Sequence, residues 1–338
     1  MQFINRNTIR KSWLPCLLLL FLNSCSRKES LTPPDALPGV LEYIQKTPSF
    51  SLLSYALTRS KLDEKLAEGN ITVFAPPDSA FLQAGWTKEK LSQLTPDSIA
   101  FVLGYQILPG LVGSESIPGF YKTYPLTLNP SYKPNISKNY YGLYFDGNHV
   151  AHANIKMGDG IIHQVDALSF PATDSLLATL YRQPDLTIFS AIVKKVWNLS
   201  NQVQQENITL IVPNDKAFLD SGYTLQGVDT ITDTMRLLRL CWPSMGESYR
   251  TGRLYGSDFI GGRLFYTEAL YLPNPDPNEG SFAFFYRYNI SLDGKEILPN
   301  FNNLVNGSTG IKIPPKFVRK NILSKGGIIH TVDQVFRP

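Results

Sequence analysis

The sequence predicts an α+β fold that occurs twice in the chain, and three observations lead to this prediction. The stretch Asn70–Phe81 is repeated without a gap at Asn207–Phe218. A second pair of similar stretches, Gly160–Asp166 and Gly327–Asp333, follows in the same order. In each unit helical patterns come first and strand patterns follow, which is typical of the α+β class. Two motifs repeated in order indicate two tandem domains of one fold.

Each copy of the first stretch predicts a buried strand that leads into a helix. The run Ile71–Phe74 consists of β-branched and aromatic residues, which suit a half-buried strand. Pro76 and Pro213 end the two strands, because proline has no N–H to donate to a neighbouring strand. Asp78 and Asp215 are expected to cap the helices that follow.

Apolar residues at helical spacing predict further helices before and after each of these strands. Such helices give each unit one layer that can cover a face of a sheet. The expected helical segments are Leu41–Ile44, Leu52–Leu57, Leu62–Leu66, Ser98–Tyr105, Ile188–Val196 and Met235–Leu240.

Strand and turn patterns fill the rest of each unit. In the first unit they run from Ile117 to Ile162, with a hairpin turn expected at Asp146-Gly147. The first shared stretches lie 137 positions apart and the closing ones 167, so the second unit has about 30 additional residues. Glycine- and proline-rich segments indicate where these residues form loops. The loop segments are 246–262 and 273–280, beside strands expected around 263–272 and 281–290.

The N-terminus predicts an export signal. Met1–Cys25 has basic residues at its start and an apolar run from Trp13 to Leu22. About ten apolar residues are too few to span a bilayer, which takes about 20. The last four residues, Leu22-Asn23-Ser24-Cys25, resemble a bacterial lipobox, whose cysteine is lipidated. We therefore predict a lipid anchor on Cys25; the alternative is ordinary signal cleavage, with Cys25 incidental.

The repeats and the N-terminus together divide the chain into five segments. Removal of the signal takes away Arg6, Arg10 and Lys11, which reduces the formal net charge from +4 to about +1. A charge this small and scattered does not indicate a nucleic-acid-binding protein. The expected segments are a signal peptide 1–24, a tether 25–36, a first domain 37–171, a linker 172–182 and a second domain 183–338 with an enlarged loop region.

Three segments of the first unit resemble a known family. Thr72–Phe81, Leu103–Gly110 and Gly160–Asp166 are similar, in order, to the characteristic segments of fasciclin-like domains, with Gln106 where histidine is usual. The second unit repeats the first and last of them. This resemblance implies two tandem domains, each a β-sandwich with short helices packed along one edge. It also implies adhesion or interaction with proteins or glycans, without catalysis and without a cofactor.

Two histidines occupy equivalent positions in the closing stretches. His163 is followed three residues later by Asp166, and His330 by Asp333. Residues three apart on a strand point to opposite faces, so neither pair converges on one ligand. We expect each histidine to form structural hydrogen bonds inside its domain.

The sequence shows no motif of a metal site or of a familiar catalytic site. His149 and His152 are the one close histidine pair, and no cysteine or carboxylate cluster completes a tetrahedral site around them. There is no Gly-x-Ser-x-Gly motif and no phosphate-binding glycine loop. Glycosidase carboxylates can be far apart in sequence, so a glycan hydrolase with dispersed carboxylates stays an alternative.

Aromatic residues in the predicted loops are the candidates for binding. Tyrosine has a flat apolar face and a polar tip, which suits sugar rings and protein partners alike. The alternative is that these rings fill the cores of the domains. The candidates are Tyr121 and Tyr124 in the first domain, and Tyr249, Tyr255, Phe259, Tyr266 and Tyr271 in the second.

Ser98 and Ser175 are candidates for O-glycosylation. Each follows an aspartate and precedes an apolar residue, which resembles the acceptor pattern of a system that some Gram-negative bacteria apply to exported proteins. The alternative is helix capping, which also favours Asp and Ser at such positions.

Together these features indicate a lipoprotein of a Gram-negative bacterium, anchored in the outer membrane and exposed at the cell surface. We expect it to bind a protein partner, such as an outer-membrane uptake transporter, or a glycan. The alternatives are the surface glycan hydrolase and a structural spacer with no ligand.

Overall fold

A computed structural model describes most of the chain from Leu37 onward. The described residues are 37–119, 122–196, 207–246, 253–266, 270–272, 282–284, 287–298 and 314–336. The predicted signal, Cys25 and the tether lie outside them, as do Tyr121 and Tyr249. Both repeats belong to one compact unit that starts at Leu37. In the described part, no helix has the length and apolar character needed to cross a membrane.

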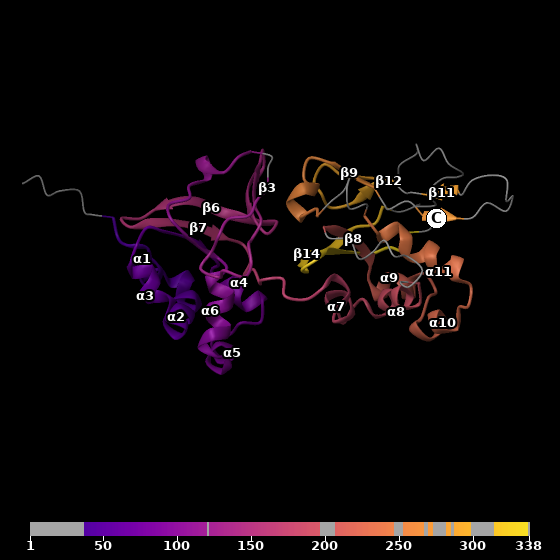
Figure 1. The fold of residues 1–338 in the computed structure, drawn as a ribbon, viewed down its shortest axis with the longest axis horizontal. Helices are drawn as coiled ribbons and strands as arrows, with labels where there is room; N and C mark the ends of the chain where they lie inside the picture. The colour runs from indigo at the N-terminus through magenta and orange to yellow at the C-terminus, as the bar shows by residue number, and fades with distance from the viewer. Residues whose placement is uncertain are drawn as a thin grey trace, which may run out of the picture. The chain divides into compact units, whose positions relative to one another are not determined.

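The first repeat begins with helices and ends with strands, as its sequence predicts. Its helices lie on one side of its strands β6 and β7 (Figure 1). Its elements are α1 (Val40–Lys46), η1 (Pro48–Phe50), α2 (Ser51–Ser60), α3 (Leu62–Ala67), β1 (Ile71–Ala75), α4 (Asp78–Gln83), α5 (Lys88–Gln93), α6 (Pro96–Gly104), β2 (Ile107–Pro109), η2 (Ser114–Ser116), β3 (Lys122–Thr123), β4 (Ile136–Asn139), β5 (Gly142–Phe145), β6 (Asn148–Lys156) and β7 (Gly160–Val165).

The seven strands of the first repeat are hydrogen-bonded in the order β2-β1-β7-β6-β5-β4-β3. β1 runs parallel to β7, and the other neighbours are antiparallel. The strand β6 contains two register shifts where it pairs with β7, and irregularities of this kind bend a strand. The β5–β6 hairpin turns at Asp146 and Gly147, whose φ angles of 51° and 76° are both positive. The predicted hairpin is therefore confirmed.

Alternation along β1 separates two cores in the first repeat. Ile71 and Val73 face α1–α6 and belong to a helix-side core. Phe74 faces the other way and joins Phe145 and Val165 in a core enclosed by the sheet itself, which we call the sheet-side core. A sheet that closes over its own apolar face and is covered by helices on the other face is the α+β sandwich that the sequence predicts.

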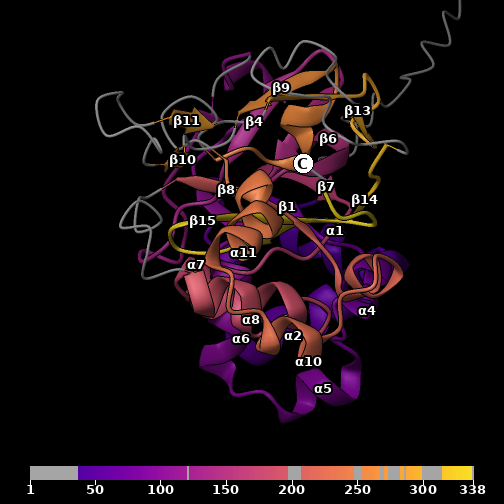
Figure 2. The same cartoon turned by 90° about the vertical axis from the view of Figure 1, so that its right-hand side faces the viewer.

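The second repeat follows the same order of helices and strands. Its helices α8 and α10 again lie to one side of β8 and β15 (Figure 2). Its described elements are α7 (Leu176–Tyr181), α8 (Thr187–Val196), β8 (Ile208–Pro213), α9 (Asp215–Asp220), α10 (Leu225–Thr230), α11 (Thr234–Cys241), η4 (Trp242–Ser244), η5 (Gly256–Phe259), β9 (Arg263–Tyr266), β10 (Leu270–Leu272), β11 (Phe282–Phe284), β12 (Arg287–Ile290), β13 (Ile297–Leu298), β14 (Phe317–Leu323) and β15 (Gly327–Val332).

The central strand pairing of the second repeat matches that of the first. β8 runs parallel to β15, as β1 does to β7, and β14 pairs antiparallel with β15 as β6 does with β7. Leu210 and Val212 face the helix-side core, and Ile211 faces the sheet-side core. The additional strands pair as β9 with β12 and β10 with β11, in the segments where the sequence predicts strands.

The predicted linker 172–182 needs correction. It contains α7, whose Leu176 and Leu180 are buried in the helix-side core of the second repeat. A Cβ placed on Gly327 would lie 3.2 Å from Leu176 Cδ1, just as one on Gly160 would lie 2.5 Å from Val40 Cγ2. The helix α7 is therefore the equivalent of α1, and the second domain begins before Leu176 and not at residue 183.

The predicted role of Asp78 and Asp215 also changes. Neither carboxylate caps the helix in which it lies. Asp78 accepts hydrogen bonds from Ser51 Oγ (2.6 Å) and Leu52 N (2.8 Å), so it caps α2. Asp215 in the same way caps α8, through Thr187 and Ile188. Each aspartate thus ties the end of the repeated strand to the first long helix of its repeat.

Replacing these aspartates should destabilise the protein. We expect Asp78→Ala and Asp215→Ala each to lower the free energy of unfolding by about 1 kcal/mol, the usual cost of a lost helix cap. Urea unfolding of the chain from Ser26 onward, followed by circular dichroism, measures this. Asp229→Ala, at the exposed end of α10, is the control and should leave the midpoint unchanged. Equal midpoints for all three variants would contradict the capping role.

Candidate functional site

The predicted histidine of the first repeat is buried and clamps two segments together. His163 Nε2 lies 2.9 Å from the carbonyl oxygen of Val112, and its Nδ1 accepts from Asn154 N at 3.2 Å. A carbonyl needs a donor and an N–H needs an acceptor, so the ring is neutral with its proton on Nε2. Burial lowers the pKa of His163. The ring also stacks on Phe74, with 4.8 Å between ring centroids.

The second repeat contains the same clamp. His330 Nε2 lies 2.8 Å from the carbonyl oxygen of Leu254, and Nδ1 accepts from Asn321 N at 3.4 Å. Burial lowers the pKa of His330 to about 3. Both histidines have no exposed surface, so they hold the fold and do not face a ligand.

Two asparagines complete these clamps, and the sequence analysis missed them. Asn154 and Asn321 have φ angles of 60° and 64°, which asparagine tolerates better than most residues. Asn154 Oδ1 accepts from Ser114 N at 2.8 Å, and Asn321 Oδ1 from Gly256 N at 2.7 Å. Each asparagine precedes its histidine by nine residues. That repeated spacing is the signal that could have revealed them.

Asp166 and Asp333, which follow the two histidines in the sequence, form no part of the clamps. Asp166 Oδ2 is 3.2 Å from His149 Nδ1 at the surface. Asp333 Oδ1 accepts from Lys316 N at 2.7 Å. Among the described residues, no group of three or more His, Cys, Asp or Glu side chains could hold a metal ion, so His149 and His152 are not part of such a group.

Most of the predicted aromatic candidates do not form an exposed site. Tyr255 and Phe259 are 2% and 0% exposed, so the prediction of exposed loop aromatics is wrong for these two. Phe259 packs in the sheet-side core, and burial raises the pKa of Tyr255. Tyr124 is 47% exposed. Tyr121, Tyr249 and the side chains of Tyr266 and Tyr271 lie outside the described residues.

Tyr255 is buried because the two repeats approach each other at Gly147. A Cβ on Gly147 would lie 2.8 Å from Tyr255 Cβ and 2.8 Å from Asn321 Oδ1. Together with its φ of 76°, this leaves room only for glycine. The hairpin turn of the first repeat therefore lies against Asn321 of the second. We call this contact the junction.

A carboxylate is buried beside this contact. Asp146 Oδ2 accepts from Tyr105 Oη and Oδ1 accepts from Asn135 N, both at 2.8 Å. Burial raises the pKa of Asp146 to about 7, although these two hydrogen bonds and the charge of Arg253 act to lower it. Desolvation dominates because the carboxyl is fully buried.

Polar contacts extend the junction on one side. Lys122 Nζ lies 2.8 Å from Asp258 Oδ2, donates to the carbonyl oxygen of Arg253 and lies 5.4 Å from the ring centroid of Tyr255. Asn139 Nδ2 donates to the carbonyl oxygen of Ser257 at 3.2 Å. The strands β3 and β4 of the first repeat thus contact η5 of the second.

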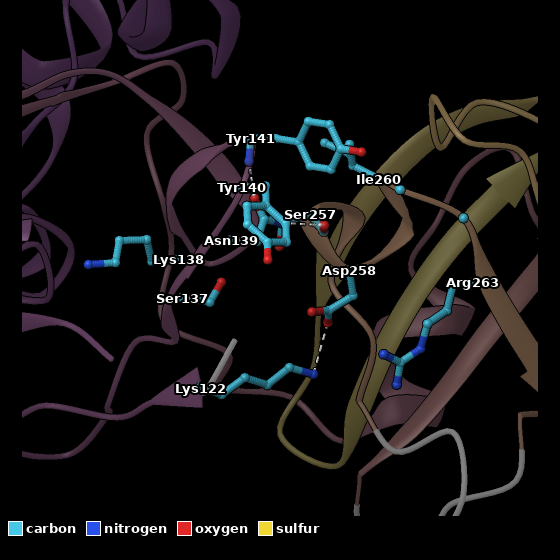
Figure 3. Close-up of a pocket in the computed structure, with 12 residues that line it drawn as sticks. Lys122, Ser137, Lys138, Asn139, Tyr140, Tyr141, Ser257, Asp258, Ile260 and Arg263 are labelled. Atoms are coloured by element: carbon cyan, nitrogen blue, oxygen red, sulfur yellow. Dashed lines mark hydrogen bonds and ion pairs between the residues drawn. The ribbon is translucent and has the colours of Figure 1, made fainter. Parts of the chain in front are cut away.

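A groove of about 560 Å³ lies beside these contacts. Figure 3 shows Tyr140 and Tyr141 on one side of it and Arg263 on the other, while Lys138 points away. Tyr140 and Tyr141 form the turn between β4 and β5 and are 87% and 56% exposed. A Cβ placed on Gly261, whose φ is 91°, would lie 3.2 Å from Tyr141 Cε2. The groove therefore combines two exposed aromatic rings with polar side chains from both repeats.

The two predicted glycosylation residues are exposed and lie at helix N-termini. Ser175 caps α7 by accepting from Ala178 N at 3.3 Å. Ser98 Oγ lies 2.8 Å from Thr95 Oγ1, and Thr95 is the cap of α6. The capping alternative therefore applies to Ser175 itself and, for α6, to its neighbour Thr95.

Comparisons with known proteins give a family match for the first repeat and a similarity to a solved structure. The family model described as the fasciclin domain matches residues 48–171. No curated protein matches the chain. A solved structure similar to the chain is described as a FAS1 domain pair from the insect cell adhesion molecule fasciclin I. It is 14% identical, the alignment covers 84% of this chain and 91% of that chain, and the TM-score is 0.36.

The first repeat is thus similar to fasciclin domains in sequence, and the second repeat has the same strand pairing and the same histidine clamp. The fasciclin-domain match thus covers the first of two tandem α+β repeats that share their central strand pairing.

The buried carboxyl at the junction predicts a pH-dependent stability. An unfolded aspartate has a pKa near 3.8, and the folded pKa of Asp146 is about 7. Between these values the unfolded chain releases the proton and the folded chain keeps it, so stability falls as the pH rises through this window. Asp146→Asn keeps an acceptor for Asn135 N and cannot ionise. Urea unfolding of freshly purified protein should show that it stabilises the chain more at pH 8 than at pH 5.

An equal effect of Asp146→Asn at both pH values would contradict a raised pKa. Asp166→Asn is the matched control, because Asp166 is at the surface and the same loss of charge there should change stability little at either pH.

Proposed function

We propose that this chain is a non-catalytic binding protein of the Gram-negative cell envelope and that it binds a saccharide in the groove between its two repeats. Lipidation of Cys25 anchors it in the outer membrane, with the repeats exposed at the cell surface. In this role it serves adhesion, or it serves as an accessory subunit that presents a glycan to an outer-membrane transporter.

The observation that carries the proposal is the pair Tyr140 and Tyr141. A soluble domain normally turns large rings inward, and here two adjacent rings stand 87% and 56% exposed at the edge of a groove. Aromatic faces stack on the apolar faces of sugar rings, while Asn139 and the hydroxyl of Ser137 supply polar groups among the lining residues.

The groove also favours binding over hydrolysis. Among the described residues that line it, Asp258 is the one carboxylate. Its Oδ2 lies 2.8 Å from both Lys122 Nζ and Tyr255 N. A glycosidase of the usual kind needs two carboxyl groups about 5 to 10 Å apart. The described part of the groove offers one, and that one stabilises the junction.

O-glycosylation of Ser98 and Ser175 stays part of the proposal. Both serines are exposed, so each is accessible to a modifying enzyme. Neither lines the groove. A glycan on either would therefore leave the binding site open.

Removal of both rings tests the function. We expect the Tyr140→Ala, Tyr141→Ala double variant to bind its saccharide about 30-fold more weakly, because two stacking contacts of about 1 kcal/mol each are lost. A panel of defined neutral and acidic oligosaccharides identifies the ligand of the chain from Ser26 onward, and isothermal titration calorimetry measures the affinities.

Tyr181→Ala is the matched control. Tyr181 is 36% exposed on α7, outside the residues that line the groove, and its loss should leave the affinity unchanged. Absence of binding to every oligosaccharide, or equal affinity of the double variant and the wild type, would contradict a saccharide site in this groove.

A further inference from the structure

The charges that line the groove are not balanced. Among its described lining residues, Lys122, Lys138 and Arg263 are basic and Asp258 is acidic. The three basic residues differ in what they contact, and this difference indicates which of them is available to a ligand.

Two of the basic side chains are already engaged. Lys122 is paired with Asp258 at 2.8 Å, so these two charges compensate each other. Lys138 Nζ donates to the carbonyl oxygen of Ser114 at 2.7 Å and points away from the tyrosines (Figure 3). Neither is placed to meet an anion between the tyrosines and Arg263.

Arg263 is different. It is the first residue of β9, its side chain is exposed, and it forms no ion pair within the part of the chain that the structure describes. Figure 3 shows its guanidinium on the side of the groove opposite Tyr140 and Tyr141. A guanidinium presents two parallel N–H donors, which match the two oxygens of a carboxylate.

We propose that the groove selects an acidic saccharide, with a sugar carboxylate bound by Arg263 while neighbouring rings stack on Tyr140 and Tyr141. This inference rests on the proposed function, because it names the class of saccharide for the same site. Arg263, which forms no ion pair with another described residue, supplies one positive charge, which matches the single charge of a uronic acid carboxylate better than the higher charge of a phosphate ester. Asp258 stays paired with Lys122 and so does not repel the ligand at full strength.

The test compares two probes, one with its carboxylates charged and one with them neutralised. The probes are a galacturonic acid hexasaccharide and the same hexasaccharide with its carboxylates methyl-esterified. Calorimetry with the wild-type chain from Ser26 onward should show tighter binding of the acid, and this preference should shrink as salt is raised. We expect Arg263→Gln to weaken binding of the acid about 10- to 100-fold and to weaken binding of the ester much less, because the ester has lost the charge that the guanidinium pairs with.

Arg239→Gln is the matched control, because it removes the same charge from the exposed surface of α11. It should leave both affinities unchanged. Equal binding of acid and ester by the wild type, or no effect of Arg263→Gln on the acid, would overturn the inference. Tighter Arg263-dependent binding of a sulfated hexasaccharide than of the galacturonate would overturn the choice of a carboxylate.

These outcomes are separate from the failure of the proposed function. If the chain binds neutral oligosaccharides through Tyr140 and Tyr141, the proposed function stands and the acidic specificity is wrong. If no oligosaccharide binds at all, both are wrong.

Discussion

The groove depends on one steric constraint, which is the close approach of Gly147 to the second repeat. A side chain at this position would collide with Tyr255 Cβ and with the side chain of Asn321. Because the turn of the first repeat can lie this close, Lys122 reaches Asp258 and Asn139 reaches the carbonyl of Ser257. The residues that line the groove come from both repeats, on the two sides of these contacts.

In the second repeat, the histidine clamp holds Asn321, the residue that Gly147 approaches. His330 accepts the N–H of Asn321, and the Asn321 side chain in turn accepts the N–H of Gly256 at the start of η5. In the first repeat, the equivalent Asn154 binds Ser114 of η2. One device therefore holds the loop between the two shared motifs in both repeats. In the second repeat, this loop contains Tyr255, which lies close to Gly147, and Asp258.

The fold was predictable because its signals are local. The repeated stretches Asn70–Phe81 and Asn207–Phe218 carry the alternation that separates helix-side and sheet-side cores, and the Asp-Gly turn is set by two residues alone. The prediction that Asp78 and Asp215 cap the helices that follow them was wrong. They cap α2 and α8, which precede the repeated strands in the sequence and lie beside them only in the folded chain.

The site was predictable only in part, because it is built from residues far apart in the sequence. Tyr255 and Tyr140 look alike in the sequence, and only the approach of Gly147 and Asn321 buries the first. The pairing of Lys122 with Asp258, which leaves Arg263 as the available cation of the groove among the described residues, likewise depends on the junction. The repeated spacing of Asn154 and Asn321 from their histidines was present in the sequence and was missed.

The most direct test of this account is the saccharide affinity of Gly147→Ala, measured by calorimetry beside Gly110→Ala. Both glycines have positive φ angles, 76° and 87°, so alanine strains the backbone at either position. Only Gly147 faces the second repeat, since no atom lies within 4 Å of a Cβ on Gly110. The account predicts that Gly147→Ala loses about tenfold or more in affinity while Gly110→Ala binds as the wild type does. Wild-type affinity in both variants would show that binding does not depend on the junction.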